Sequence, residues 1–171
     1  MRTHKCLWPT FTVLVAAAFT TAAIAADLPK EGTYSGTYSN PGTYKAYPVR
    51  KERVAVSWEA DGATVGTGFL DHTTWHCFGL EDVASGTQQW HGYCILTDPA
   101  GDQIMTSVIS EKHTQDTKNF GATGTFTAGT GKFTGIEGGV TFLCHNNADF
   151  RTATAGTYVF LADLKAGYKL P

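Results

Sequence analysis

The feature of this sequence that most constrains its fold is a two-residue alternation of apolar and polar side chains. Between Phe120 and Thr127, the residues Phe120, Ala122, Gly124 and Phe126 alternate with three threonines. Because successive side chains of a strand point to opposite faces of a sheet, this alternation predicts a strand with one face toward a core. Helical periodicity is nearly absent, whereas Gly, Thr and aromatic residues recur along the chain. The sequence therefore predicts an all-β protein.

Eight or so strands, joined by short turns, account for most of the chain. We expect them at residues 32–38, 50–59, 64–70, 71–80, 88–97, 103–110, 120–128, 138–145 and 152–161. Turn-forming residues occupy 40–42, 61–62, 98–102, 129–131 and 146–147, and the polar stretch 112–119 is long enough for a mobile loop. No domain boundary is visible, so the pattern favours one up-and-down barrel or one sandwich.

The first 26 residues have the pattern of a cleaved secretory signal peptide. Arg2 and Lys5 give a positive start, an apolar run follows from residue 11, and Ala23-Ile24-Ala25 forms a small-residue cleavage site beside Ala26. The run is short and rich in Ala and Thr, which disfavours a membrane span and leaves an uncleaved anchor as the alternative. The expected product is a single domain of residues 27–171, secreted or periplasmic, with no integral membrane span.

The charge of the exported chain argues against a nucleic-acid partner. Loss of Arg2 and Lys5 leaves 11 basic residues against 15 acidic ones, a net charge of −4. Nucleic-acid binding calls for a basic surface, and membrane-surface binding for a basic cluster or amphipathic helix. The sequence has neither feature.

Three cysteines remain in the exported chain, which predicts one disulfide and one spare thiol. A two-residue turn at Ser85-Gly86 would place Cys77 opposite Cys94, with Trp75 and Trp90 on the same face. We therefore predict a disulfide between Cys77 and Cys94. Pairing of either residue with Cys144 remains an alternative, and an unpaired cysteine would also permit a disulfide-linked homo-oligomer.

The histidine pattern does not predict a metal site. His72 and His76 have the spacing of a helical metal motif, but residues four apart on a strand lie roughly 13 Å apart and cannot share an ion. The segment 98–102 lacks the regular ligand spacing of a calcium loop and is better interpreted as a turn. No metal and no cofactor are predicted.

Candidates for catalysis are few. Glu52 and Asp71 lie near predicted strand ends, where either carboxylate would reach the mouth of a barrel. Cys144 is a candidate nucleophile, but its neighbour His145 would point to the opposite face of the sheet. The predicted interior is otherwise aromatic and poor in acids and bases, which favours binding over catalysis.

The segment from Gly129 to Lys132, GTGK, invites comparison with a phosphate-binding loop. Such a loop needs a glycine where this chain has Phe126 and a Ser or Thr where it has Phe133. No helix follows to receive a phosphate at its N-terminus. The segment is therefore predicted to be a hairpin turn.

The same hairpin resembles one in the allene oxide cyclase and dirigent-like barrel superfamily. The matching residues are Gly129, Thr130, Gly131, Lys132, Phe133, Gly135, Ile136 and Gly138. Gly92-Tyr93-Cys94, Thr97-Asp98 and Gly101-Asp102 are similar to exported bacterial members, so the resemblance spans residues 92–142. It implies a single eight-stranded antiparallel β-barrel, calycin-like in architecture, with an apolar cavity. Plant members use that cavity for cyclisation or radical coupling without a cofactor.

These observations lead us to expect an exported barrel that binds a small hydrophobic or aromatic molecule in its cavity. The candidate binding residues are the inward-facing aromatics Tyr34, Tyr38, Trp58, Trp75, Trp90, Phe126 and Phe142. One alternative is a cofactor-free isomerase or cyclase assisted by Glu52, Asp71 or Cys144. A second alternative is a secreted interaction protein whose Thr-rich outer faces dock a partner.

Overall fold

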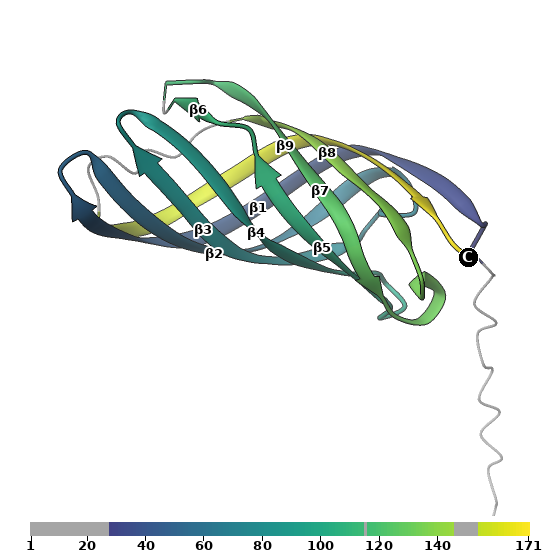
Figure 1. Ribbon diagram of the computed structural model, residues 1–171. Helices are drawn as coiled ribbons and strands as arrows, with labels where there is room; N and C mark the ends of the chain where they lie inside the picture. The colour runs from purple at the N-terminus through teal and green to yellow at the C-terminus, as the bar shows by residue number, and fades with distance from the viewer. Residues whose placement is uncertain (1–27, 115, 146–153) are drawn as a thin grey trace, which may run out of the picture.

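The computed structural model describes residues 28–114, 116–145 and 154–171, which form one closed antiparallel β-barrel (Figure 1). The predicted signal peptide and the predicted turn at 146–147 lie outside the described residues. No helix within the described ranges is long and apolar enough to cross a membrane. The expectation of an all-β, eight-stranded barrel is confirmed.

Eight long strands form the wall in the order of the chain. They are β1 (Glu31–Arg50), β2 (Arg53–Gly68), β3 (Thr74–Ala84), β4 (Thr87–Thr97), β5 (Gln103–Ser110), β7 (Asn119–Gly129), β8 (Glu137–His145) and β9 (Ala155–Lys169). Each pairs with its neighbours, and β9 closes the barrel by pairing with β1. The two-residue strand β6 (His113–Thr114) adds to β4, and the short 3-10 helix η1 (Gly131–Phe133) connects β7 to β8.

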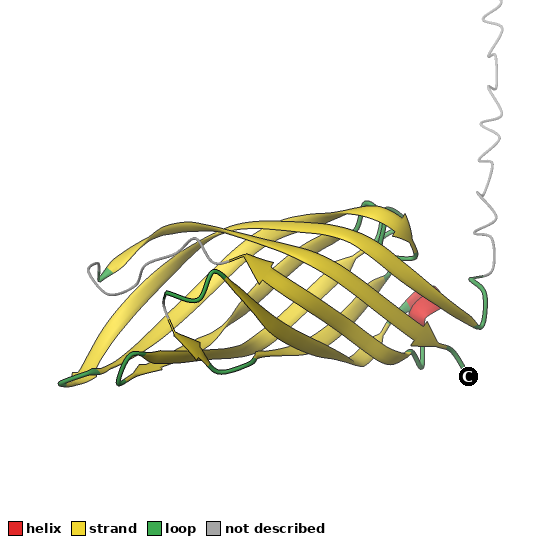
Figure 2. Ribbon diagram, turned by 90° about the horizontal axis from the view of Figure 1, so that it is seen from above, coloured by secondary structure: helices red, strands yellow, loops and turns green. Residues whose placement is uncertain are grey.

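The two ends of the barrel differ. At the end that we call the terminal end, the C-terminus lies beside the start of β1, and η1 packs close by (Figure 2). The opposite end, which we call the β6 end, carries the β1–β2 turn, the β3–β4 turn and β6 (Figure 1). Side chains fill the terminal half, where Leu70, Leu96, Ile104 and Phe133 are almost fully buried. Filling of this kind is usual for eight strands.

The β3–β4 hairpin confirms the predicted register. Ser85 and Gly86 form its two-residue turn with positive φ angles of 50° and 78°, as a type I′ turn requires. Cys77 lies opposite Cys94, and the two form a disulfide with a Cα–Cα distance of 4.1 Å. Cys144 is free and buried, so neither alternative pairing is formed.

Two predicted turns proved wrong, because β1 and β2 run through them. Residues 40–42 and 61–62 lie opposite each other in the β1–β2 ladder, between the pairs Ser39↔Ala63 and Gly42↔Ala60. Pro41 has no N–H for a ladder, and a Cβ on Gly62 would lie 2.3 Å from the Ser39 carbonyl oxygen. The turn-forming residues therefore allow a close approach of two long strands instead of ending them.

Three further boundaries differ from prediction. The strands expected at 64–70 and 71–80 are separated by a loop at 69–73, because Leu70 turns into the core. The last strand extends to Lys169, beyond the predicted 161, because it pairs with both β1 and β8. The predicted mobile loop 112–119 contains β6, whose His113 is buried.

The GTGK segment forms the connection between β7 and β8, as predicted. Lys132 is paired with the carboxylate of Asp98 in the loop between β4 and β5, and its backbone N–H donates to Asp102 Oδ2 at 3.3 Å. Phe133 points into the core. Lys132 therefore joins two loops of the terminal end.

Replacement of both Cys77 and Cys94 with Ser is expected to lower the free energy of unfolding by about 3 kcal/mol. The cross-link joins residues 17 positions apart and restricts the unfolded chain. Urea unfolding followed by tryptophan fluorescence would measure the change. Reductant should destabilise the wild-type protein similarly and leave the double variant unaffected. A wild-type midpoint that does not move with reductant would contradict this prediction.

Candidate functional site

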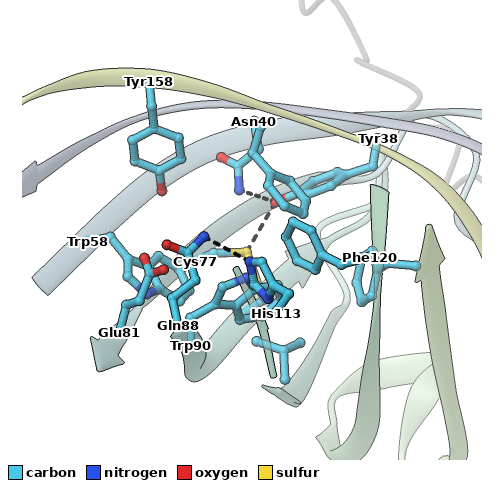
Figure 3. Close-up of a pocket in the computed structure, with 14 residues that line it drawn as sticks. Tyr38, Asn40, Trp58, Cys77, Glu81, Gln88, Trp90, His113, Phe120 and Tyr158 are labelled. Atoms are coloured by element: carbon cyan, nitrogen blue, oxygen red, sulfur yellow. Dashed lines mark hydrogen bonds between the residues drawn. A yellow bond between two sulfur atoms is a disulfide. The ribbon is translucent and has the colours of Figure 1, made fainter. Parts of the chain in front are cut away.

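A cavity lies inside the barrel toward the β6 end (Figure 3). Its lining residues come from β1, β2, β3, β4, β5, β6, β7, β8 and β9: Tyr38, Asn40, Trp58, Cys77, Glu81, Gln88, Trp90, Cys94, Val108, His113, Phe120, Phe142, Tyr158 and Phe160. About 70 Å³ is open to the centres of water-sized molecules. One water needs roughly 10–15 Å³ of such space, so the cavity has room for about five to seven waters, or for one small molecule with a single aromatic ring.

Aromatic rings form most of the cavity wall. The Trp58 and Trp90 rings meet edge to face with centroids 5.9 Å apart, and Phe160 lies 6.0 Å from Trp90. Two glycines make room for this arrangement, because a Cβ on Gly79 or Gly92 would lie within 3.0 Å of the Trp58 ring. The absence of side chains at these two positions of the β3–β4 hairpin therefore lets the Trp58 indole lie against the hairpin backbone.

The disulfide orients one amide at the cavity. The Tyr38 hydroxyl contacts Cys77 Sγ at 3.2 Å, and a disulfide sulfur has no proton, so Tyr38 donates and the sulfur accepts. The same hydroxyl accepts a hydrogen bond from Asn40 Nδ2. This leaves Asn40 Oδ1 as a buried oxygen without a hydrogen-bond partner among the residues that the structure describes.

His113 orients a second amide in the same way. Its Nδ1 lies 2.9 Å from the backbone carbonyl of Glu111, which can only accept, so Nδ1 carries a proton. In the neutral ring Nε2 is then an acceptor, and Gln88 Nε2 donates to it at 2.9 Å. The ring also stacks on Phe120 with centroids 3.7 Å apart. Gln88 Oε1 is left buried, with no hydrogen-bond partner in the described part of the chain.

Glu81 is the acidic side chain of the cavity. It is only 4 % exposed, and burial raises its pKa from 4.5 to about 7. Within the described ranges, no cation forms a salt bridge with Glu81 and its Oε1 has no hydrogen-bond partner. Trp58 Nε1 is likewise buried and unpartnered. Such atoms call for an explanation, since each unsatisfied buried group costs about 1–3 kcal/mol.

The candidate binding residues divide between the cavity and the rest of the core. Tyr38, Trp58, Trp90 and Phe142 line the cavity. The other three, Tyr34, Trp75 and Phe126, are buried in the core but do not line it.

None of the candidate catalytic residues lines the cavity. Glu52 is exposed in the β1–β2 turn with a φ of 61°. Asp71 lies at the terminal end, where its Oδ1 accepts a hydrogen bond from the Gly66 N–H at 3.0 Å. Cys144 is fully buried, and burial raises the pKa of its thiol, which disfavours the nucleophilic thiolate.

The expectation that Glu52 and Asp71 are the only inward ionisable groups was wrong. Glu81 lies on the same face of β3 as Cys77, four residues away, so the alternation that oriented the cysteine also orients the carboxyl. No comparable pattern exists for His113, because a two-residue strand in a polar segment gives no periodic signal. Within residues 28–114, 116–145 and 154–171, no cluster of His, Cys, Asp or Glu could hold a metal ion.

No protein-family model, curated protein or solved structure matches this chain.

Glu81 should make the stability of the protein depend on pH. Because its pKa is higher in the folded state, the folded protein binds more protons between about pH 4.5 and 7, and the free energy of unfolding falls as pH rises through this window. The difference from 4.5 to about 7 corresponds to about 3 kcal/mol. Relative to the wild-type protein, Glu81→Gln should therefore gain stability between pH 4.5 and 8.

Urea unfolding of both proteins across this range would test the prediction. Glu137→Gln, on an exposed position at the start of β8, is the matched control and should follow the wild-type curve. A constant difference between Glu81→Gln and the wild-type protein at all pH values would contradict the raised pKa.

Proposed function

We propose that this protein is exported and binds a small, mainly aromatic molecule in the cavity at the β6 end. The observation that carries the proposal is the combination of aromatic walls with buried polar atoms that have no hydrogen-bond partner in residues 28–114, 116–145 and 154–171. Binding sites for small molecules commonly have this composition, an apolar lining with a few oriented polar groups.

The size of the cavity limits the ligand and its affinity. Space for about five to seven waters corresponds to one aromatic ring with a small substituent or to a short branched chain. Even very efficient ligands gain at most about 1.5 kcal/mol per non-hydrogen atom, or about 10 kcal/mol for the seven such atoms of phenol, so a dissociation constant no tighter than roughly 20 nM is expected. The unpartnered polar atoms would determine the orientation of the ligand more than they would increase its affinity.

One feature supports export of the protein, and another supports the proposal that a barrel of this kind binds a small molecule in its cavity. The Cys77–Cys94 disulfide suits an oxidising compartment, in agreement with the predicted signal peptide. Residues 92–142 resemble the allene oxide cyclase and dirigent-like barrels, whose plant members hold small hydrophobic molecules. We propose that this chain belongs to the same superfamily.

Titration with phenol is a direct test. The indole N–H resonance of Trp58 should shift in ¹H–¹⁵N spectra, because Trp58 Nε1 is buried and unpartnered beside the cavity. Val108→Phe, which fills the cavity from β5, should weaken binding at least tenfold. Val65→Phe, at an exposed position of β2, is the matched control and should bind like the wild-type protein.

Two results would contradict the proposal. One is an unshifted Trp58 resonance at millimolar phenol, and the other is unchanged affinity in a folded Val108→Phe protein. Dispersion of the same spectra reports folding of each variant.

A second candidate function is a cofactor-free isomerase in which Glu81 moves a proton. It is favoured by a buried carboxyl with a pKa of about 7 inside the cavity, since acid–base catalysis works best with a pKa near the working pH. Acetophenone, with one ring and exchangeable α-hydrogens, is a suitable probe.

In heavy water the wild-type protein should accelerate exchange of these hydrogens, and Glu81→Gln should lose the acceleration by 100-fold or more. Proton NMR would follow the reaction, with Glu137→Gln as the control. Equal rates with wild-type protein and Glu81→Gln would exclude this role for Glu81.

A further inference from the structure

The free polar atoms of the cavity are mostly acceptors. Among the described residues, three buried oxygens have no hydrogen-bond partner: Asn40 Oδ1, Gln88 Oε1 and Glu81 Oε1. Trp58 Nε1 is the corresponding donor without a partner. The three oxygens come from β1, β4 and β3, and Figure 3 shows their side chains around one cavity. A ligand that satisfies them must bring donors.

The orientation of both amides follows from their partners. Asn40 directs its nitrogen to Tyr38, whose hydroxyl donates to the proton-free disulfide sulfur. Gln88 directs its nitrogen to His113, whose Nδ1–H is held by a backbone carbonyl. If either amide were rotated by 180°, its oxygen would face an atom that is itself a hydrogen-bond acceptor. The acceptor character of the cavity is therefore built into the hydrogen-bond network.

The ionisable groups that line the cavity also favour a cationic ligand over an anionic one. Its lining contains no Lys or Arg, and Glu81 is its carboxyl group. The other titratable groups that face the cavity are Tyr38 from β1, His113 from β6 and Tyr158 from β9. Burial raises the pKa of both tyrosines, and Glu81 raises that of Tyr158 further, so the tyrosines stay neutral. An anionic ligand would meet two amide oxygens and a carboxylate, which is unfavourable.

We propose that the cavity takes a small primary amine with an apolar body, bound as the ammonium ion between Glu81, Asn40 and Gln88. The proposal rests on the proposed function, because it needs the same cavity. An ammonium group has three N–H donors, which matches three free acceptor oxygens. The aromatic faces of Trp58 and Trp90 would stabilise the cation further.

Binding of the amine must release a proton. Below about pH 7 the Glu81 carboxyl is mostly protonated, and the ammonium ion enters already charged. The Glu81 proton then passes to solvent, leaving a carboxylate paired with the ammonium group. Affinity should consequently rise about tenfold per pH unit below pH 7 and level off above pH 8.

Calorimetry with benzylamine, benzyl alcohol and benzoate would test the proposal, because the three share one ring and differ in the polar group. At pH 8 benzylamine should bind at least tenfold more tightly than benzyl alcohol, and benzoate more weakly than both. Glu81→Gln should abolish the preference for the amine, whereas Glu137→Gln should keep it.

Proton release offers a readout that does not depend on the Glu81 variant. Titrations of the wild-type protein at pH 6 in buffers of different ionisation enthalpy should show release of close to one proton per benzylamine, and this release should fall to about a tenth of a proton at pH 8, where Glu81 is already ionised. The absence of release at pH 6, or equal release at pH 6 and pH 8, would overturn the assignment to Glu81.

The remaining outcomes separate the two proposals. If benzyl alcohol binds and benzylamine binds no tighter, the cavity is a binding site but the amine inference is wrong. If the amine preference survives in Glu81→Gln, the inference is also wrong. If no probe binds, the proposed function fails and the inference fails with it.

Discussion

The pairing of the last strand with the first holds this structure together. From Glu31↔Lys169 to Lys45↔Ala155, β1 and β9 form a continuous ladder between the two ends of the described chain. Without it the sheet would have two long edges with unpaired N–H and C=O groups. With it, one face of every strand is enclosed, and each inward side chain must fit the interior of eight strands. Both the packed terminal half and the cavity follow from this closure.

Local signals in the sequence predicted some elements well and others poorly. Ser85-Gly86 predicted its hairpin because two residues with positive φ permit essentially one kind of turn, and the cysteines then paired. Asn40-Pro41-Gly42 misled because Pro and Gly mark both turns and close approaches of strands. The distinction depends on β9, which pairs with that part of β1 and lies more than a hundred residues away.

In the cavity too, features that follow from local sequence patterns could be predicted, whereas those that depend on contacts between distant segments could not. Trp58, Trp90 and Tyr38 could be placed inside from alternation alone, and Glu81 has the same parity as Cys77. The polar network could not be predicted, because it depends on where β6 lies against β4 and on a hydrogen bond to a disulfide sulfur. A few polar groups in an aromatic interior lower stability, but they also give the cavity a chemical preference that rings alone do not supply.

The first and last described residues lie together at one end of the barrel, so the two ends of the barrel are not equivalent. Leu170 N–H donates to the Lys30 carbonyl at 2.8 Å, and the Tyr168 hydroxyl donates to the Pro29 carbonyl at 2.9 Å, so both ends of the wall are fastened together at the terminal end. The cavity lies toward the other end, since its lining includes Gln88 at the start of β4 and His113 of β6. A barrel tethered at either end of the described wall, to a surface or to a fused domain, would therefore point its cavity away from the attachment.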